Sequence, residues 1–202
     1  MTEKAKIGVM ILAAGASSRL GYPKQLVKFR GKFLLQHIID TIESLNFDPK
    51  VVVLGAKSDE IIDKIVPGNF EVVINDHWEL GMSSSIKKGL HRLLELENEL
   101  DYILVLLSDQ PYVNKEKIMG LISVQLKGNV PATFSEYTGD IGVPAIFSAK
   151  VFPFLKELKG DQGARKLIVD KKFEFQAVKF EGGNFDVDTT KDVELLKQLE
   201  KQ

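Results

Sequence analysis

Short apolar runs alternate with segments of helical period along the first half of the chain. The runs cover residues 7–12, 51–55, 71–75 and 102–107, each long enough for one buried strand. Segments typical of helices follow them, at residues 32–45, 58–65, 83–97 and from about residue 115. Four such strand–helix pairs with short connections predict an α/β fold, in which helices cover both faces of a mostly parallel central sheet.

The pattern is less regular in the second half. Strands are expected at residues 131–135, 144–147 and 173–180. A helical period over residues 150–169 is interrupted at Gly160, and a closing helix is expected at residues 189–200. The sequence contains no internal repeat, low-complexity tract or linker, so a single domain over residues 1–202 is predicted.

A loop of small residues follows the first predicted strand. Residues 13–18 read A-A-G-A-S-S, and Arg19 and Lys24 then return two cations toward the loop. Small residues let backbone N–H groups approach a ligand closely, and successive N–H groups form an anion-binding nest. These features indicate a triphosphate-binding loop. The alternative is a turn kept small for packing, and neither a GxxxxGK[ST] nor a GxGxxG motif is present.

Composition narrows the function classes. The formal net charge of −1 excludes a generally basic protein of the kind that binds nucleic acid or membranes through its overall charge. Cysteine is absent, which excludes disulfides, thiolate metal sites and cysteine nucleophiles. No apolar run reaches the length of a membrane span and no signal peptide is evident, so a cytoplasmic protein is expected.

Carboxylates follow the strand over residues 102–107 and recur near the C-terminus. Asp109 lies just beyond that strand, where it can hold Mg²⁺ together with substrate phosphates or can simply form a turn. In an extended segment Asp186 and Asp188 point to the same side, so either can complete a metal site. Asp188 can instead cap the closing helix, and the residues alone do not decide between these roles.

Residues 12–26, L-A-A-G-A-S-S-R-L-G-Y-P-K-Q-L, closely resemble the signature loop of sugar-phosphate and molybdopterin nucleotidyltransferases. The resemblance implies their Rossmann-like α/β/α fold. It also implies that the nucleotide is bound by Leu12, Ala13, Ala14, Gly15, Arg19 and Lys24. Gly81 and Ser85, at the start of a predicted helix, match positions that contact base and ribose. By the same resemblance Arg19, Lys24 and Asp109 are the catalytic residues.

Two later stretches resemble the molybdopterin cytidylyltransferase branch. They are G-V-P-A-I-F at residues 142–147 and G-D-Q-G-A-R at residues 160–165. The resemblance implies an acceptor site formed by Gly142, Pro144, Asp161 and Arg165. From the residues alone, Arg165 can bind an acceptor phosphate, or it can pair with a helix-capping Asp161. Val143 departs from this branch, which often has His at that position.

The resemblance implies a Mg²⁺-dependent nucleotidyltransferase. The expected reaction moves CMP from CTP to molybdopterin and releases pyrophosphate, because LAAG rather than an LAGG-type loop accompanies G-D-x-G-A-R. Guanylyl transfer to molybdopterin and nucleotidyl transfer to a sugar or polyol phosphate are alternatives. An alternative from a different class of function is a non-catalytic maturation factor that binds a client molybdenum enzyme. A glycosyltransferase is disfavoured because Ser108–Gln110 is not a D-x-D motif.

Overall fold

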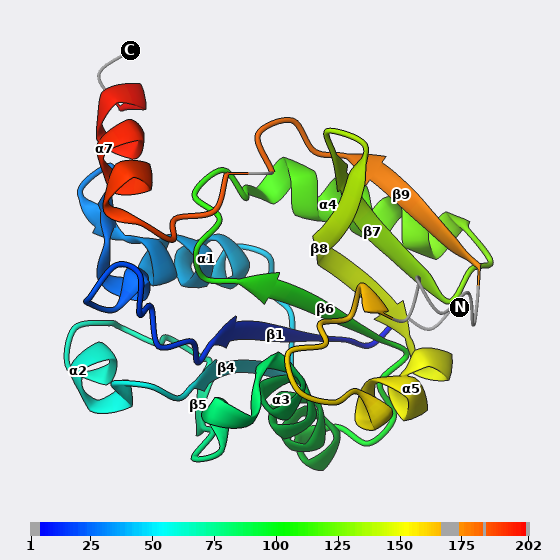
Figure 1. Cartoon of the computed structure of the whole chain (residues 1–202). Helices are drawn as coiled ribbons and strands as arrows, with labels where there is room; N and C mark the ends of the chain where they lie inside the picture. Colours follow the sequence, from blue (N-terminus) through cyan, green and yellow to red (C-terminus); the bar gives the residue numbers. More distant parts are fainter. Residues whose placement is uncertain (1–4, 167–173, 184, 201–202) are drawn as a thin grey trace.

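The main sheet has seven strands in the computed structural model, which describes residues 5–166, 174–183 and 185–200 (Figure 1). Its strand order is β5-β4-β1-β6-β8-β7-β9. The strands are β1 (Ile7–Ala13), β4 (Lys50–Leu54), β5 (Glu71–Ile74), β6 (Tyr102–Leu107), β7 (Ala132–Tyr137), β8 (Asp140–Ser148) and β9 (Phe175–Lys179). Only β8 runs against the others within this sheet, so the predicted mostly parallel sheet is confirmed.

Helices cover both faces of the sheet, as predicted (Figure 1). α1 (Leu34–Glu43) and α4 (Lys115–Lys127) pack on one face, and α3 (Met82–Leu96) and α5 (Phe152–Glu157) pack on the other. The remaining described helices are α2 (Ser58–Ile62), α7 (Thr190–Leu199) and the short 3-10 helices η1 (Lys24–Leu26), η2 (Trp78–Leu80) and η3 (Ala149–Val151). In the predicted helical segment over residues 150–169, α5 ends at Glu157 and the chain turns at the predicted interruption at Gly160; residues 167–169 lie outside the described part.

The central position of β1 explains its unbroken apolar run. Val9 and Ile11 lie in the core on the α1 side, whereas Met10 and Leu12 lie in the core on the α3 side. All four side chains are buried. β1 pairs in parallel with β4 and β6, so it has no exposed edge. A strand in this position needs apolar residues at successive positions rather than at alternate ones.

One hairpin was not predicted, and the strands of a second are longer than predicted. β2 (Lys28–Phe29) and β3 (Lys32–Phe33) form a short antiparallel ribbon, so α1 begins at Leu34 and not at residue 32. Residues 136–142 were expected to be a connection, but most of them belong to the β7–β8 hairpin. Its turn is formed by Thr138 and Gly139, which have φ values of 50° and 81°. Two successive residues with positive φ are typical of tight hairpin turns.

The C-terminal helix α7 docks beside the segment that follows the small-residue loop (Figure 1). Val187 is fully buried in an apolar cluster with Leu20, Val27 and Leu196. The N–H of Val187 also donates to the carbonyl oxygen of Asp109 at 3.2 Å. These contacts bring the C-terminal carboxylates to the same edge of the sheet as the end of β6.

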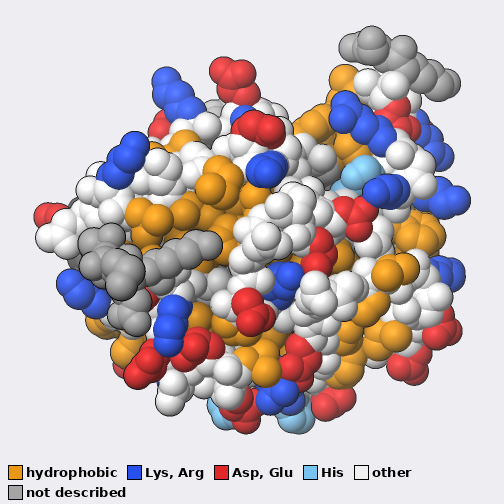
Figure 2. Space-filling view, turned by 180° about the vertical axis from the view of Figure 1, so that it is seen from behind, with side chains coloured by type: hydrophobic (Ala, Val, Ile, Leu, Met, Phe, Trp, Pro, Cys, Tyr) orange, Lys and Arg blue, Asp and Glu red, His pale blue; other side chains and the backbone are white. Residues whose placement is uncertain are grey.

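The outer surface is charged but mixed. On the face shown in Figure 2, acidic and basic side chains are interspersed rather than gathered into separate regions. Among the described residues, no helix is both long and apolar enough to cross a membrane.

Candidate functional site

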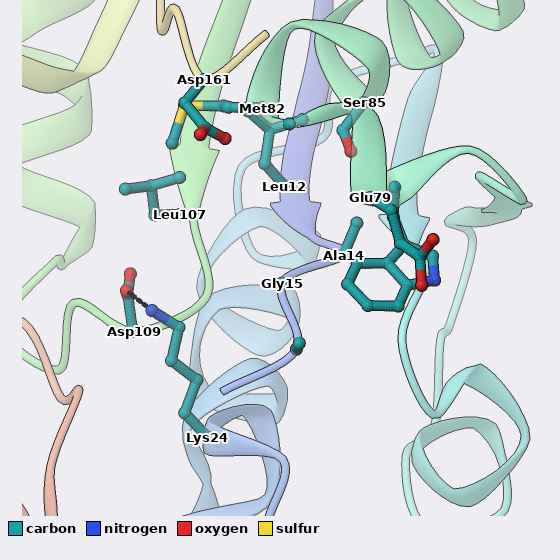
Figure 3. Close-up of a pocket in the computed structure, with 13 residues that line it drawn as sticks. Leu12, Ala14, Gly15, Lys24, Glu79, Met82, Ser85, Leu107, Asp109 and Asp161 are labelled. Atoms are coloured by element: carbon teal, nitrogen blue, oxygen red, sulfur yellow. Dashed lines mark hydrogen bonds and ion pairs between the residues drawn. The ribbon is translucent and has the colours of Figure 1, made fainter. Parts of the chain in front are cut away.

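The segments that follow β1, β5 and β6 meet in one cavity of about 330 Å³ (Figure 3). These strands are parallel, so their carboxyl ends lie at the same edge of the sheet, where open α/β sheets bind ligands. The predicted site residues that line the cavity are Leu12, Ala14, Gly15, Lys24, Gly81, Ser85, Asp109 and Asp161. Ala13 and Arg19 do not line it, and the side chain of Ala13 is buried in the core on the α1 side.

The small-residue loop is closed by Ser17. Its backbone has φ 54°, its carbonyl oxygen accepts from the N–H groups of Leu20 and Gly21, and its Oγ accepts from the N–H of Lys24 at 3.0 Å. The chain therefore turns back on itself between residues 17 and 24. This turn explains how Lys24, which begins a 3-10 helix, reaches the cavity next to Gly15.

Lys24 is bound by carboxylates from two distant parts of the chain. Its Nζ lies 2.5 Å from Asp109 Oδ2 and 2.8 Å from Asp188 Oδ1. The contact with Asp109 is drawn as a dashed line in Figure 3. Burial alone would lower the pKa of Lys24, but the two carboxylates outweigh it and raise this pKa. Arg19 Nη2 lies 2.7 Å from the other oxygen of Asp188. Both predicted phosphate-binding cations are thus paired with carboxylates.

The three candidate metal-binding carboxylates have different surroundings. Burial would raise the pKa of Asp188, but Lys24 and Arg19 lower it. Asp186 is an exposed residue, but partial desolvation, followed by the charge of Asp109, raises its pKa to about 6. The helix cap is Thr189, whose Oγ1 accepts from the backbone of α7. Asp188 is therefore not the N-cap residue. Neither Asp186 nor Asp188 lines the cavity, but Asp188 contacts Lys24, which does.

A divalent cation fits this arrangement. Asp109 Oδ1 is buried and has no hydrogen-bond partner among the described residues. Asp186 lies close enough to Asp109 for its pKa to be raised, so the two carboxylates repel each other. An all-oxygen donor set suits a hard ion such as Mg²⁺ or Mn²⁺. Among the described residues, however, no three acidic or histidine side chains already form a metal-binding group, and Lys24 provides the positive charge.

The four predicted acceptor residues are split between two places. Asp161 reaches the cavity because its loop packs on the start of α3, where Ser83 N–H donates to the carbonyl oxygen of Gly160 at 3.0 Å. A Cβ on Gly81 would lie 2.4 Å from the carbonyl carbon of Gly160, so this approach needs a glycine. Arg165 instead forms a bidentate ion pair with Asp140 on the β7–β8 hairpin. It does not pair with Asp161, the alternative considered from the sequence.

Gly142 and Pro144 lie on β8, the second strand of this hairpin. A Cβ on Gly142 would clash with the hydroxyl of Tyr137, which donates to the carbonyl oxygen of Val143 at 3.2 Å. Burial, followed by the charges of Asp186 and Asp140, raises the pKa of Tyr137 to about 12. Tyr137 therefore stays a neutral hydrogen-bond donor next to the predicted acceptor residues.

Several cavity residues were not predicted. They are Trp78, Glu79, Met82 and Leu107, whereas Ala16 belongs to the predicted small-residue loop. Trp78 is the only tryptophan in the sequence and lies shortly before Gly81, so its position was the one available signal. The others carry no chemical pattern that separates them from ordinary loop or strand residues.

Comparison with known proteins relates this chain to one family and to several proteins of similar length and fold. The family described as MobA-like NTP transferase domain matches residues 9–175. The purine catabolism protein PucB of Bacillus subtilis (strain 168) is 27% identical over 205 residues, covering 95% of this chain and 96% of PucB. Among solved structures, the Rv0371c homologue from Mycobacterium sp. strain JC1 is 31% identical with a TM-score of 0.84, covering 96% of this chain and 97% of that one. Rv0371c of Mycobacterium tuberculosis in complex with manganese is 25% identical, with a TM-score of 0.80 and coverage of 96% and 99%.

Proposed function

Because the chain belongs to the family of MobA-like NTP transferase domains, we propose that it transfers CMP from CTP to molybdopterin and releases pyrophosphate. The family is one of nucleotidyltransferases, so a nucleoside triphosphate is the expected donor. The observation that carries the proposal is the meeting of the small-residue loop, Lys24 and Asp109 around one cavity. A loop for phosphates, a cation and a buried carboxylate are the parts that phosphoryl-group chemistry needs.

In the proposed reaction, a phosphate oxygen of the acceptor attacks the α-phosphorus of the bound nucleotide. The new bond joins that oxygen to the α-phosphorus, and the bond from the α-phosphorus to the bridging oxygen breaks, so pyrophosphate leaves with the electron pair. The attacking phosphate is already an anion, so no general base is needed. Catalysis then depends on positioning and on neutralising phosphate charge.

Lys24 and Arg19 exchange partners when the triphosphate binds. The phosphates replace Asp188 as the partner of both cations, and Asp109 loses the Lys24 amine that faces it. Asp109, with Asp186 or Asp188, would then hold Mg²⁺. The ion would neutralise charge on the phosphates. The manganese complex of Rv0371c supports the use of a divalent cation by a relative of this chain.

The methyl group of Ala14 supports a preference for CTP over purine nucleotides. Ala14 places a methyl group in the wall where an LAGG-type loop has glycine, so a purine would have less room. Ser85 Oγ accepts from Asn75 Nδ2 at 3.0 Å, and both side chains are buried. This leaves the hydroxyl hydrogen of Ser85 to donate to an acceptor atom of the base or ribose.

The acceptor would lie on the β8 side of the cavity, near Gly142 and Pro144, with Arg165 close to its phosphate. Since Arg165 is paired with the half-exposed Asp140, it can exchange this partner for a phosphate at little cost. A client molybdenum enzyme would receive the product.

Pyrophosphate release tests the proposal. The protein is incubated with Mg²⁺, molybdopterin and each of CTP, GTP, ATP and UTP in turn, with glycerol phosphate and sugar phosphates as alternative acceptors. We expect release with CTP and molybdopterin above the other combinations. Release with GTP would support the guanylyl alternative, and release with a sugar phosphate would replace the acceptor. Nucleotide binding with no release for any pair would contradict an enzymatic role.

A further inference from the structure

We infer that Gln25 positions the backbone of the small-residue loop for the phosphates of its ligand. The inference rests on the proposed function in one respect, that the ligand carries a polyphosphate. Gln25 follows Lys24 in η1, and its side chain has 0% exposure. It lies behind the loop, so it cannot contact a ligand in the cavity and acts only through the residues that it holds.

The amide nitrogen of Gln25 binds two carbonyl groups of the loop. Nε2 donates to the carbonyl oxygen of Ala13 at 2.6 Å and, more weakly, to that of Gly15 at 3.4 Å. The carbonyl between them, that of Ala14, accepts from the N–H of Ala56 at 3.1 Å. Three successive carbonyl groups of the loop are therefore bound inside the protein.

Binding these carbonyl groups orients the opposite ends of their peptide planes. In a trans peptide the C=O of one residue and the N–H of the next point in opposite directions. By holding the carbonyls of Ala13 and Gly15, Gln25 therefore turns the N–H groups of Ala14 and Ala16 away from itself. Both residues line the cavity, and in the described part of the chain neither N–H donates to another protein group. These donors are free to bind phosphate oxygens.

The unpaired oxygen of Gln25 argues against a purely structural role. Its Oε1 is buried and has no hydrogen-bond partner among the described residues. An unpaired buried acceptor is unfavourable, and methionine would fill a similar volume without one. The two N–H donors of Gln25, which hold the loop, offset this cost.

The test compares polyphosphate binding with nucleoside binding, by the fluorescence of Trp78 in the cavity wall. Wild type and the variants Gln25→Met and Gln25→Glu are titrated with inorganic tripolyphosphate, CTP and cytidine in the presence of Mg²⁺. Gln125→Met is the matched control. Gln125 is equally buried and its Nε2 donates to the carbonyl oxygen of Val130 at 2.8 Å, but it lies on α4 and does not line the cavity.

We expect Gln25→Met to weaken tripolyphosphate and CTP binding by about tenfold or more, the effect of misplacing charge-assisted hydrogen bonds. Gln25→Glu should lose more, because its carboxylate repels both the loop carbonyls and the phosphates. Cytidine binding, and all binding by Gln125→Met, should stay within about twofold. If a folded Gln25→Met variant binds tripolyphosphate as wild type does, the positioning role of Gln25 is overturned, while the proposed function is unaffected. Failure of wild type to bind any polyphosphate would overturn the proposed function, and with it the inference.

A measurement on wild type covers the case in which both variants unfold. Adding tripolyphosphate should shift the backbone amide resonances of Ala14 and Ala16 in NMR spectra, while the side-chain amide resonances of Gln25 stay protected from exchange. Unchanged loop resonances, or rapid exchange of the Gln25 amide, would overturn the positioning role.

Discussion

Replacing Lys24 by methionine should turn the carboxylates around it into a metal site that no longer needs nucleotide. In wild type the Lys24 amine lies between Asp109 and Asp188, at 2.5 Å and 2.8 Å. The carboxylates raise its pKa, so it is charged and competes with any cation for this position. Methionine has a similar length and no charge, so the variant leaves the carboxylates facing one another.

The loss of stability expected for Lys24→Met follows from how deeply the ion pair between Lys24 and Asp109 is buried. The side chains of Lys24 and Asp109 are only 19% and 8% exposed, and removing one partner of a buried ion pair costs about 3–5 kcal/mol. Because Asp188 is about one-third exposed, we take the lower end, about 3 kcal/mol. For a domain of this size the melting temperature should fall by roughly 6–12 °C. A divalent ion at about 100 times its Kd returns about 2.7 kcal/mol, most of the loss.

Thermal unfolding with increasing MnCl₂ and no nucleotide measures both effects. We expect the Lys24→Met variant to regain most of its lost melting temperature, while wild type responds little. Lys50→Met is the matched control, since Lys50 is 5% exposed and lies 2.7 Å from Glu43, in a pair that does not line the cavity. It should lose stability without regaining it in MnCl₂.

An equal response of wild type and Lys24→Met to MnCl₂ would refute the reasoning. It would show that Lys24 does not compete with a cation. An unchanged melting temperature of the variant without metal would show that the ion pair contributes nothing to stability.

Three further substitutions test individual roles. Asp109→Asn should abolish pyrophosphate release without unfolding the protein, and normal turnover by a folded variant would rule Asp109 out as an essential residue. Ala14→Gly should relax the preference for CTP over GTP by about tenfold, and an unchanged ratio of the two dissociation constants would show that the Ala14 methyl group does not set this preference. Arg165→Ala should raise the KM for the acceptor while leaving CTP affinity intact, and equal losses for both substrates would contradict an acceptor role.

The first half of the fold could be predicted because β1, β4 and β6 are largely buried on both faces, while the edge strand β5 is apolar from Val72 to Ile74 although only Val73 is buried. β1, β4, β5 and β6 are apolar at successive positions, and their predicted bounds agree with the structure to within a residue. The β7–β8 hairpin could not be predicted in the same way. It lies toward the edge of the sheet, its ends carry Glu136 and Asp140, and Thr138–Gly139 resembles any polar loop.

The candidate site, like the fold, could be predicted only in part from the sequence. The positions of the small-residue loop and of Asp109 followed from one rule, that the carboxyl ends of parallel strands share an edge. The ion-pair partners of the charged site residues could not be predicted by this rule, because the two partners come from distant segments of the chain. Lys24 and Asp188 are 164 residues apart, and Arg165 and Asp140 are 25 apart. Gln25 was missed because its role depends on burial and on two backbone carbonyl groups, which leave no pattern in the sequence.

The most direct test of the proposed reaction is the mass of its product. Wild-type protein is incubated with molybdopterin, Mg²⁺ and an equimolar mixture of CTP, GTP, ATP and UTP, and the products are identified by liquid chromatography and mass spectrometry. The proposed function predicts a dinucleotide heavier than molybdopterin by one cytidylyl group, formed in excess over the other three. A guanylyl, adenylyl or uridylyl product in excess would contradict the cytidylyl assignment, and unmodified molybdopterin beside intact nucleotides would contradict the transfer itself.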